Sequence, residues 1–167
     1  VLLKNKGKAG IVLPDGSLTG TGVKERIREN LLKSCNVHTI VKLPNSVFKP
    51  YATVSTNMIF LEKGSPTKEI WYYEHQLPEG IKNYSKTKPI KFEDFSKLQE
   101  WWNDRKENNF AWKVSIKEIE QNKWELDCKN PFEEKIIIKN PEEIMKKLES
   151  DQYSDEYKNQ LMEDILK

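Results

Sequence analysis

The sequence has 167 residues and a mass of 19.7 kDa, enough for one good hydrophobic core or two small ones. Its 28 basic and 26 acidic residues leave a net charge of +2, so bulk charge neither requires nor excludes a nucleic-acid partner. No apolar run approaches the ~20 residues of a membrane helix, which excludes a membrane-spanning protein. Cys35 and Cys128 lie far apart, and the sequence has only two histidines. This pattern disfavours a zinc site or a disulfide-stapled secreted fold and indicates a reducing cytoplasm.

The beginning of the chain predicts a strand followed by a helix. Residues 10–14 form a short apolar run that ends at Pro14-Asp15-Gly16, which is typical of a strand buried on both faces. Residues 21–33 carry Val23, Ile27 and Leu31 at four-residue spacing. This spacing predicts an amphipathic helix that turns these three residues toward a core.

Three more strands are expected, at residues 37–44, 56–62 and 69–74. The segment between the first two of these is too short for a covering helix, so they cannot be parallel neighbours joined by a crossover. An antiparallel strand inserted into an otherwise parallel sheet explains this spacing. The joint at residues 63–68 is short enough for a hairpin between the last two.

The later part of the chain favours helices. Residues 92–105 predict an amphipathic helix, and residues 115–121 predict a short one with Ser115 as its cap and Glu118 as the capping-box partner. Two further helices are expected after Asn140 and Ser154, both highly charged and with narrow apolar stripes. We therefore expect three regions: an α/β part over residues 1–90, a helical or irregular extension over 91–133, and helices over 134–167.

The sequence contains no complete catalytic constellation: it has no Gly-x-Gly-x-x-Gly loop, no Walker loop and no nucleophile elbow. Its most informative feature is a pair of segments that follow expected strands. One is the turn at Pro14 and Asp15, and the other is the loop that carries Phe48. Since ligands of open α/β sheets bind beyond the carboxyl ends of strands, both segments are expected at one ligand-binding edge.

Four blocks of the sequence resemble the modification subunit of type I restriction-modification systems, a family of S-adenosylmethionine-dependent N6-adenine DNA methyltransferases. The blocks are GKAGIVLPDGSL, GVKERIRENLL, VHTIVKLPNSVFKPYATVSTNMIFLEKG and AWKVSIKEI. The resemblance covers about residues 7–133 and is most specific over residues 10–63. It implies an α/β fold: the C-terminal part of a Rossmann-like methyltransferase sheet with an antiparallel strand, followed by a helical extension.

The resemblance also implies roles for particular residues. Phe48 matches the family position that packs against the flipped adenine, Pro14 and Asp15 would wall the same cleft, and Asn57 is a weaker candidate. The family's cofactor loop and its Asn-Pro-Pro-Phe motif are absent, so no catalytic, cofactor-binding or metal residue is assigned. The S-adenosylmethionine site would lie mostly upstream, and the chain alone should not methylate DNA.

The partners implied by the resemblance are double-stranded DNA, the specificity subunit and the restriction subunit, with the C-terminal helices contributing to docking. Each residue assignment has a plainer alternative: Phe48 as an anchor of its loop, the turn at Pro14 as an ordinary strand end, and Asn57 as the start of a strand. Two other functions also stay open. One is a non-catalytic protein-interaction module, and the other is a methyltransferase that acts on RNA or protein.

Overall fold

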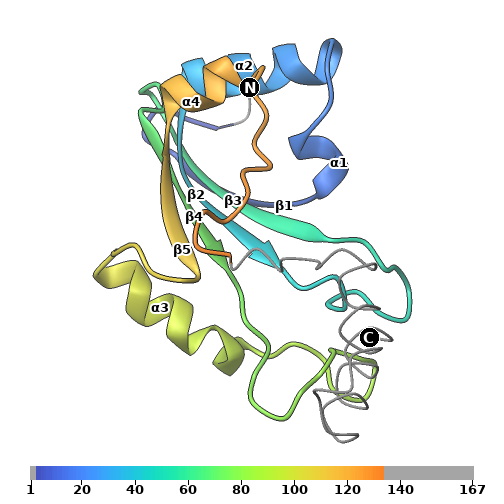
Figure 1. The fold of residues 1–167 in the computed structure, drawn as a ribbon. Coiled ribbons are helices and arrows are strands. Elements are labelled where there is room, and N and C mark those ends of the chain that lie inside the picture. Colours follow the sequence, from blue (N-terminus) through green and yellow to red (C-terminus); the bar gives the residue numbers. More distant parts are fainter. Residues whose placement is uncertain (1–2, 134–167) are drawn as a thin grey trace, which may run out of the picture. The chain divides into compact units, whose positions relative to one another are not determined.

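The computed structural model describes residues 3–133, which form a mixed α/β unit around one five-stranded sheet (Figure 1). The strand order is β1-β3-β2-β4-β5. The strands are β1 (Lys8–Pro14), β2 (Cys35–Leu43), β3 (Thr56–Lys63), β4 (Glu69–Glu74) and β5 (Ala111–Ser115). The helices are α1 (Asp15–Leu18), α2 (Val23–Ser34), η1 (Phe92–Phe95), α3 (Ser96–Asn103) and α4 (Ile116–Gln121).

The inserted antiparallel strand is β3. It pairs antiparallel with β1 on one side and with β2 on the other, so β1 and β2 run in the same direction. Strand β4 pairs with β2 in parallel, and β5 pairs antiparallel with β4. The short segment 45–55 therefore connects two adjacent antiparallel strands, as its length predicts.

The predicted hairpin between β3 and β4 is wrong, because β1 and β2 already occupy both edges of β3. The chain instead crosses the beginning of β2 and continues as β4 along the edge of β2 that β3 leaves free. Thr67 holds this crossing in place. The Thr67 hydroxyl accepts a hydrogen bond from the Val37 N–H (2.9 Å) and donates one to the Cys35 carbonyl (2.8 Å). The Thr67 N–H donates to the Leu32 carbonyl at the end of α2 (2.8 Å).

The two faces of the sheet carry separate cores, since successive side chains of a strand point to opposite faces. On one face, α2 and α4 cover a cluster that includes Leu32, Ile40, Ile59, Tyr72, Trp112, Ile119 and Leu126. On the other face, α3 covers a smaller cluster of Val41, Leu43, Tyr73, Leu98, Trp101 and Ala111. Both clusters lie on β2 and β4, which places the best-packed part of the unit at the middle of the sheet.

Helix α2 forms where its apolar spacing predicts and packs Leu31 against the core, but Val23 and Ile27, expected on the same face, do not reach it. Val23 and Ile27 are 64% and 61% exposed, whereas Arg28 is 3% exposed and Leu32 1% exposed. The Arg28 guanidinium donates to four backbone carbonyls, of Trp124 (2.7 Å), Thr19 (2.9 Å), Gly20 (2.5 Å) and, more weakly, Ser17 (3.5 Å). A buried charge is tolerated here because its N–H groups are hydrogen-bonded.

Burial of residues 10–14 on both faces is also not observed in the described part of the chain. Ile11 is 43% exposed and Val12 is 52% exposed. Strand β1 lies at an edge of the sheet, with β3 as its neighbour on one side. No described element pairs with its other side.

The segment expected to be helical or irregular, 91–133, contributes more to the sheet than its sequence indicates. Residues 92–105 form η1 followed by the shorter helix α3, and β5 extends the sheet beyond β4. The Ser115 cap of α4 is confirmed: its hydroxyl accepts from the Glu118 N–H, and the Glu118 carboxylate accepts from the Ser115 N–H. The helices expected after Asn140 and Ser154 lie outside the described residues. Within residues 3–133, no helix has the length and apolarity that crossing a bilayer requires.

Candidate functional site

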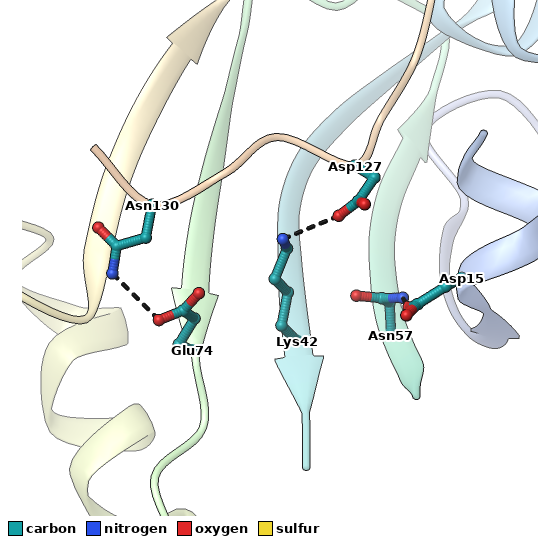
Figure 2. Close-up of polar contacts among 6 residues, drawn as sticks. All are labelled: Asp15, Lys42, Asn57, Glu74, Asp127 and Asn130. Carbon is teal, nitrogen blue, oxygen red and sulfur yellow. Dashed lines mark hydrogen bonds and ion pairs between the residues drawn. The ribbon is translucent and has the colours of Figure 1, made fainter. Parts of the chain in front are cut away.

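The parallel strands β1, β2 and β4 end at one edge of the sheet, where β3 begins (Figure 2). The turn after β1 and the loop after β2 therefore lie at the same edge, as expected from the sequence. Ligands of α/β sheets bind beyond the carboxyl ends of parallel strands, so this edge is the candidate site.

The turn after β1 is tied directly to the start of β3. Pro14 is exposed and faces Thr56 across the β1–β3 ladder. The Asp15 N–H donates to the Ser55 carbonyl (3.1 Å), and the Asn57 amide donates to the Asp15 carboxylate (2.6 Å; Figure 2). Asn57 is 1% exposed, so it has almost no surface to offer a ligand. Its geometry is that of a residue that orients the half-buried Asp15 side chain.

Phe48 lies in the loop 44–55, which leaves β2 and returns into β3. Its ring is 43% exposed, and its carbonyl accepts from the N–H groups of Tyr51 (2.9 Å) and Ala52 (3.0 Å). The buried Ser46 anchors this loop, because its hydroxyl accepts the Tyr84 N–H (3.0 Å). The loop is thus ordered by hydrogen bonds, and none of them requires the exposed phenyl ring.

Two polar pairs at this edge were not anticipated from the sequence (Figure 2). Lys42 on β2 forms an ion pair with Asp127 (2.9 Å), and the Asn130 amide donates to the Glu74 carboxylate (3.0 Å) at the end of β4. Both pairs attach the segment 125–131 across the sheet. The partners are 85 and 56 residues apart in sequence, so no local pattern points to them.

His75 follows β4 and connects three parts of this edge. Its N–H donates to the Lys42 carbonyl (2.9 Å), and its Nε2 lies 3.1 Å from the Tyr84 hydroxyl. Burial lowers the pKa of His75, although the Asp94 carboxylate opposes this. Burial, with Asp94 adding to it, raises the pKa of Tyr84 to about 12. Both side chains are therefore neutral near pH 7 and act as hydrogen-bonding supports for the loops around them.

No cluster of three or more His, Cys, Asp or Glu side chains suited to a metal ion occurs within residues 3–133. The residues of this described range also do not make up a site for S-adenosylmethionine. The glycines of the described chain do not form a glycine-rich phosphate or nucleoside loop, and Asp15, the carboxylate after β1, is already bound to Asn57. We therefore derive no chemical step through a cofactor from these residues.

Comparison with known proteins connects this architecture to a family. The model of the N-6 DNA methylase family matches residues 1–140. The chain belongs to this family. It is 49% identical over 173 residues to the methylase subunit of the type I restriction enzyme EcoEI from Escherichia coli, which covers 99% of the chain and 35% of that subunit.

Two solved structures agree with this relationship. A modification subunit assigned to a type I restriction enzyme of Vibrio vulnificus is 44% identical, with a TM-score of 0.70 over 77% of this chain and 28% of that one. A structure that concerns the assembly and conformational transition of a type I restriction-modification system is 34% identical, with a TM-score of 0.73 over 87% of this chain and 32% of that one. The expected resemblance to type I modification subunits is confirmed. The chain spans about a third of the length of the relatives it matches.

Proposed function

We propose that this chain forms part of a type I restriction-modification methyltransferase that transfers a methyl group from S-adenosylmethionine to N6 of adenine in a specific DNA sequence. The single observation that carries the proposal is the position of Phe48: an exposed aromatic ring on an ordered loop at the carboxyl edge of the sheet, in a chain of the N-6 DNA methylase family. The polypeptide that would bind the cofactor and the adenine amino group is not in this sequence.

The chemistry of the target explains why such a ring is useful. The amino group of adenine cannot be reached inside a duplex, so enzymes of this type extrude the base and hold it by stacking and hydrogen bonds. Stacking of a base on an aromatic side chain contributes about 1–3 kcal/mol and does not depend on sequence. We assign this stacking to Phe48. Pro14 and Asp15 form the neighbouring wall, and Asn57 acts as a positioning residue that orients Asp15.

Substitution of Phe48 in the full-length parent protein tests this assignment. Phe48→Ala is expected to weaken binding to a duplex carrying the target site by roughly 5- to 150-fold, the equivalent of one lost stack. It is also expected to reduce the fluorescence gain of 2-aminopurine placed at the target adenine, which reports unstacking, and to leave S-adenosylmethionine affinity unchanged. Phe48→Tyr is expected to retain most of the binding.

Phe110 provides a matched control. Its ring is 45% exposed, nearly the same as that of Phe48, but it lies beside β4 and β5 rather than between β2 and β3. Phe110→Ala is expected to leave both DNA binding and the 2-aminopurine signal intact. Equal loss of DNA and cofactor binding in Phe48→Ala would mean that Phe48 anchors the fold. A parent protein that methylates RNA or protein but not DNA would overturn the proposed substrate.

We further propose that the chain docks onto the specificity subunit through residues 134–167, within a complex that also contains the restriction subunit. The narrow apolar stripes of these charged residues support this assignment. Their structure lies outside the described residues. A parent protein lacking residues 133–167 should fail to assemble with the specificity subunit in size-exclusion chromatography, and normal assembly would refute the docking role.

The proposed roles also divide the chain into the three regions expected from the sequence. Residues 1–90 would supply the target-base side of the catalytic domain, residues 91–133 its extension, and residues 134–167 the docking part. The 167-residue chain alone is expected to transfer no methyl group from S-adenosylmethionine to DNA in a radiolabel assay. Detectable transfer would show that the assignment of the cofactor site to upstream polypeptide is wrong.

A further inference from the structure

A second feature of the carboxyl edge is a concentration of positive charge beside the Phe48 loop. We call residues 82–91 the lysine segment, because they contain Lys82, Lys86, Lys88 and Lys91 and no acidic residue. All four side chains are exposed, and none of them forms an ion pair with another residue of the described range 3–133. The whole chain carries a net charge of only +2, so this is a local positive patch rather than a general property.

The lysine segment is held against the Phe48 loop by its single buried residue. Tyr84 is 1% exposed, its N–H donates to the Ser46 hydroxyl (3.0 Å), and its own hydroxyl lies 3.1 Å from His75 Nε2. Since the Tyr84 pKa is about 12, its phenol keeps its proton near neutral pH and this anchor persists. The lysines therefore project from a segment with a defined position.

The same contact forms a shallow hollow between the two loops. Lys49, Pro50 and Thr53 line it from the Phe48 loop, and Ser85, Lys86 and Thr87 line it from the lysine segment. Reciprocal hydrogen bonds between the backbones of Ser85 and Lys88, of 3.0 and 3.1 Å, close the turn that carries Lys86. Two lysines, two threonines and one serine thus line the hollow. Lys82, Lys88 and Lys91 follow or precede Lys86 within the same short segment.

Three acidic residues flank the lysine segment, and none of them forms an ion pair with its lysines within residues 3–133. Glu79 precedes the lysine segment, and Glu93 and Asp94 follow it. The Asp94 carboxylate accepts the Lys91 N–H (2.9 Å), so it is used to begin η1. Lysine ammonium groups and hydroxyls on an ordered turn are suited to phosphate oxygens, which account for most hydrogen bonds between proteins and nucleic acids.

We propose that the lysine segment, with Lys49, binds the phosphates that flank the target nucleotide in double-stranded DNA. This inference rests on the proposed function, because it assumes that the Phe48 loop faces the extruded base. Extrusion of a base requires that the strand on either side of it be held, and phosphate contacts hold a strand without reading its sequence. The segment thereby contributes affinity and positioning but no sequence preference.

The salt dependence of DNA binding by the full-length parent protein tests this proposal. Each lost phosphate contact reduces the slope of log K against log salt concentration by about 0.9. The variant K82Q/K86Q/K88Q is expected to reduce this slope by about 2 to 3 between about 50 and 200 mM KCl, in fluorescence anisotropy titrations with a target duplex. Its affinity should fall at least tenfold at the lower salt concentration, and by a similar factor for a duplex without the target site.

The control removes three exposed lysines from the opposite end of the sheet: Lys68 before β4, Lys117 in α4 and Lys123 after α4. The variant K68Q/K117Q/K123Q has the same change in charge and should keep the slope of the unsubstituted protein. Equal slope changes in both variants would indicate a general charge effect and overturn the proposal. An unchanged slope in K82Q/K86Q/K88Q would also overturn it, while leaving the Phe48 assignment standing. Absence of DNA binding by the parent itself would overturn both.

Discussion

The buried Arg28 offers the sharpest test of how this unit is held together. Its guanidinium donates three short hydrogen bonds to backbone carbonyls: those of Thr19 and Gly20, which follow α1, and that of Trp124, which follows α4. A fourth, longer bond of 3.5 Å reaches the Ser17 carbonyl within α1. Arg28 therefore joins the segment after α1 to the segment after α4, which continues across the sheet as residues 125–131. No other residue of the described chain contacts both segments through three such hydrogen bonds.

The magnitude follows from these contacts. A hydrogen bond to a charged group contributes about 1.5–3 kcal/mol, and a neutral one about 0.5–1.5 kcal/mol. We use about 1 kcal/mol for each of the three short bonds, which is below the range for a charged donor, because Gly20 and Thr19 lie near the surface and water can replace the lost donor. Arg28→Met, which keeps the unbranched apolar stem of the side chain and removes the guanidinium, is thus expected to reduce the free energy of unfolding by about 3 kcal/mol. Arg28→Lys, which reaches fewer carbonyls, should cost about 2 kcal/mol.

Urea unfolding of the 167-residue chain, followed by tryptophan fluorescence, measures this effect. With a slope of about 1.5–2 kcal/mol per molar urea, the midpoint should fall by about 1.5–2 M in Arg28→Met. Arg26, two residues earlier and exposed, is the matched control, and Arg26→Met should change stability by less than about 0.5 kcal/mol. Equal stabilities of Arg28→Met and Arg26→Met would refute the argument that the guanidinium joins the two segments.

Three further predictions concern the hydrogen bonds and the titration of the unit. Burial lowers the pKa of His75 and of His38 below the ordinary value of 6.5, so as the pH falls the unfolded chain takes up these protons before the folded chain does. The free energy of unfolding should therefore be level above about pH 6.5 and decrease as the pH drops. The urea midpoint of His75→Gln should decrease less steeply over the same pH range. Thr67→Val leaves one donor and one acceptor at the start of β2 without partners and should cost about 2 kcal/mol in urea unfolding, whereas Thr67→Ser should cost less than half of that; equal losses would contradict the role of the hydroxyl. Ser115→Ala removes the cap of α4 and should cost about 1 kcal/mol, and Ser115→Asp should restore most of it; no loss in the alanine variant would mean that packing alone holds the helix.

Much of the fold follows from short-range patterns. Five features lie close to their expected positions: the strands at 35–43, 56–63 and 69–74, the helix at 23–34 and the Ser115 cap. Each of them depends on residues that are close together in the sequence. The inserted antiparallel strand was also predictable, since eleven residues between two strands leave no room for a crossover helix.

The errors have a common physical cause. An apolar spacing identifies a helix but not which of its residues meet the core, so Val23 and Ile27 were expected inward and the burial of Arg28 was not anticipated. A short joint permits a hairpin but cannot show that both edges of β3 are already taken. The strand at 111–115 was missed because its pairing with β4 depends on a partner about forty residues away.

The candidate site divides in the same way. The sequence by itself determined the strand ends, the turn at Asp15, the loop with Phe48 and the family resemblance, because these are properties of neighbouring residues. Tertiary structure alone decided that Asn57 turns inward to bind Asp15, that Lys42 pairs with Asp127, and that Tyr84 anchors the lysine segment. Contacts of this kind join residues tens of positions apart, and they form only after the sheet has set which strand lies beside which.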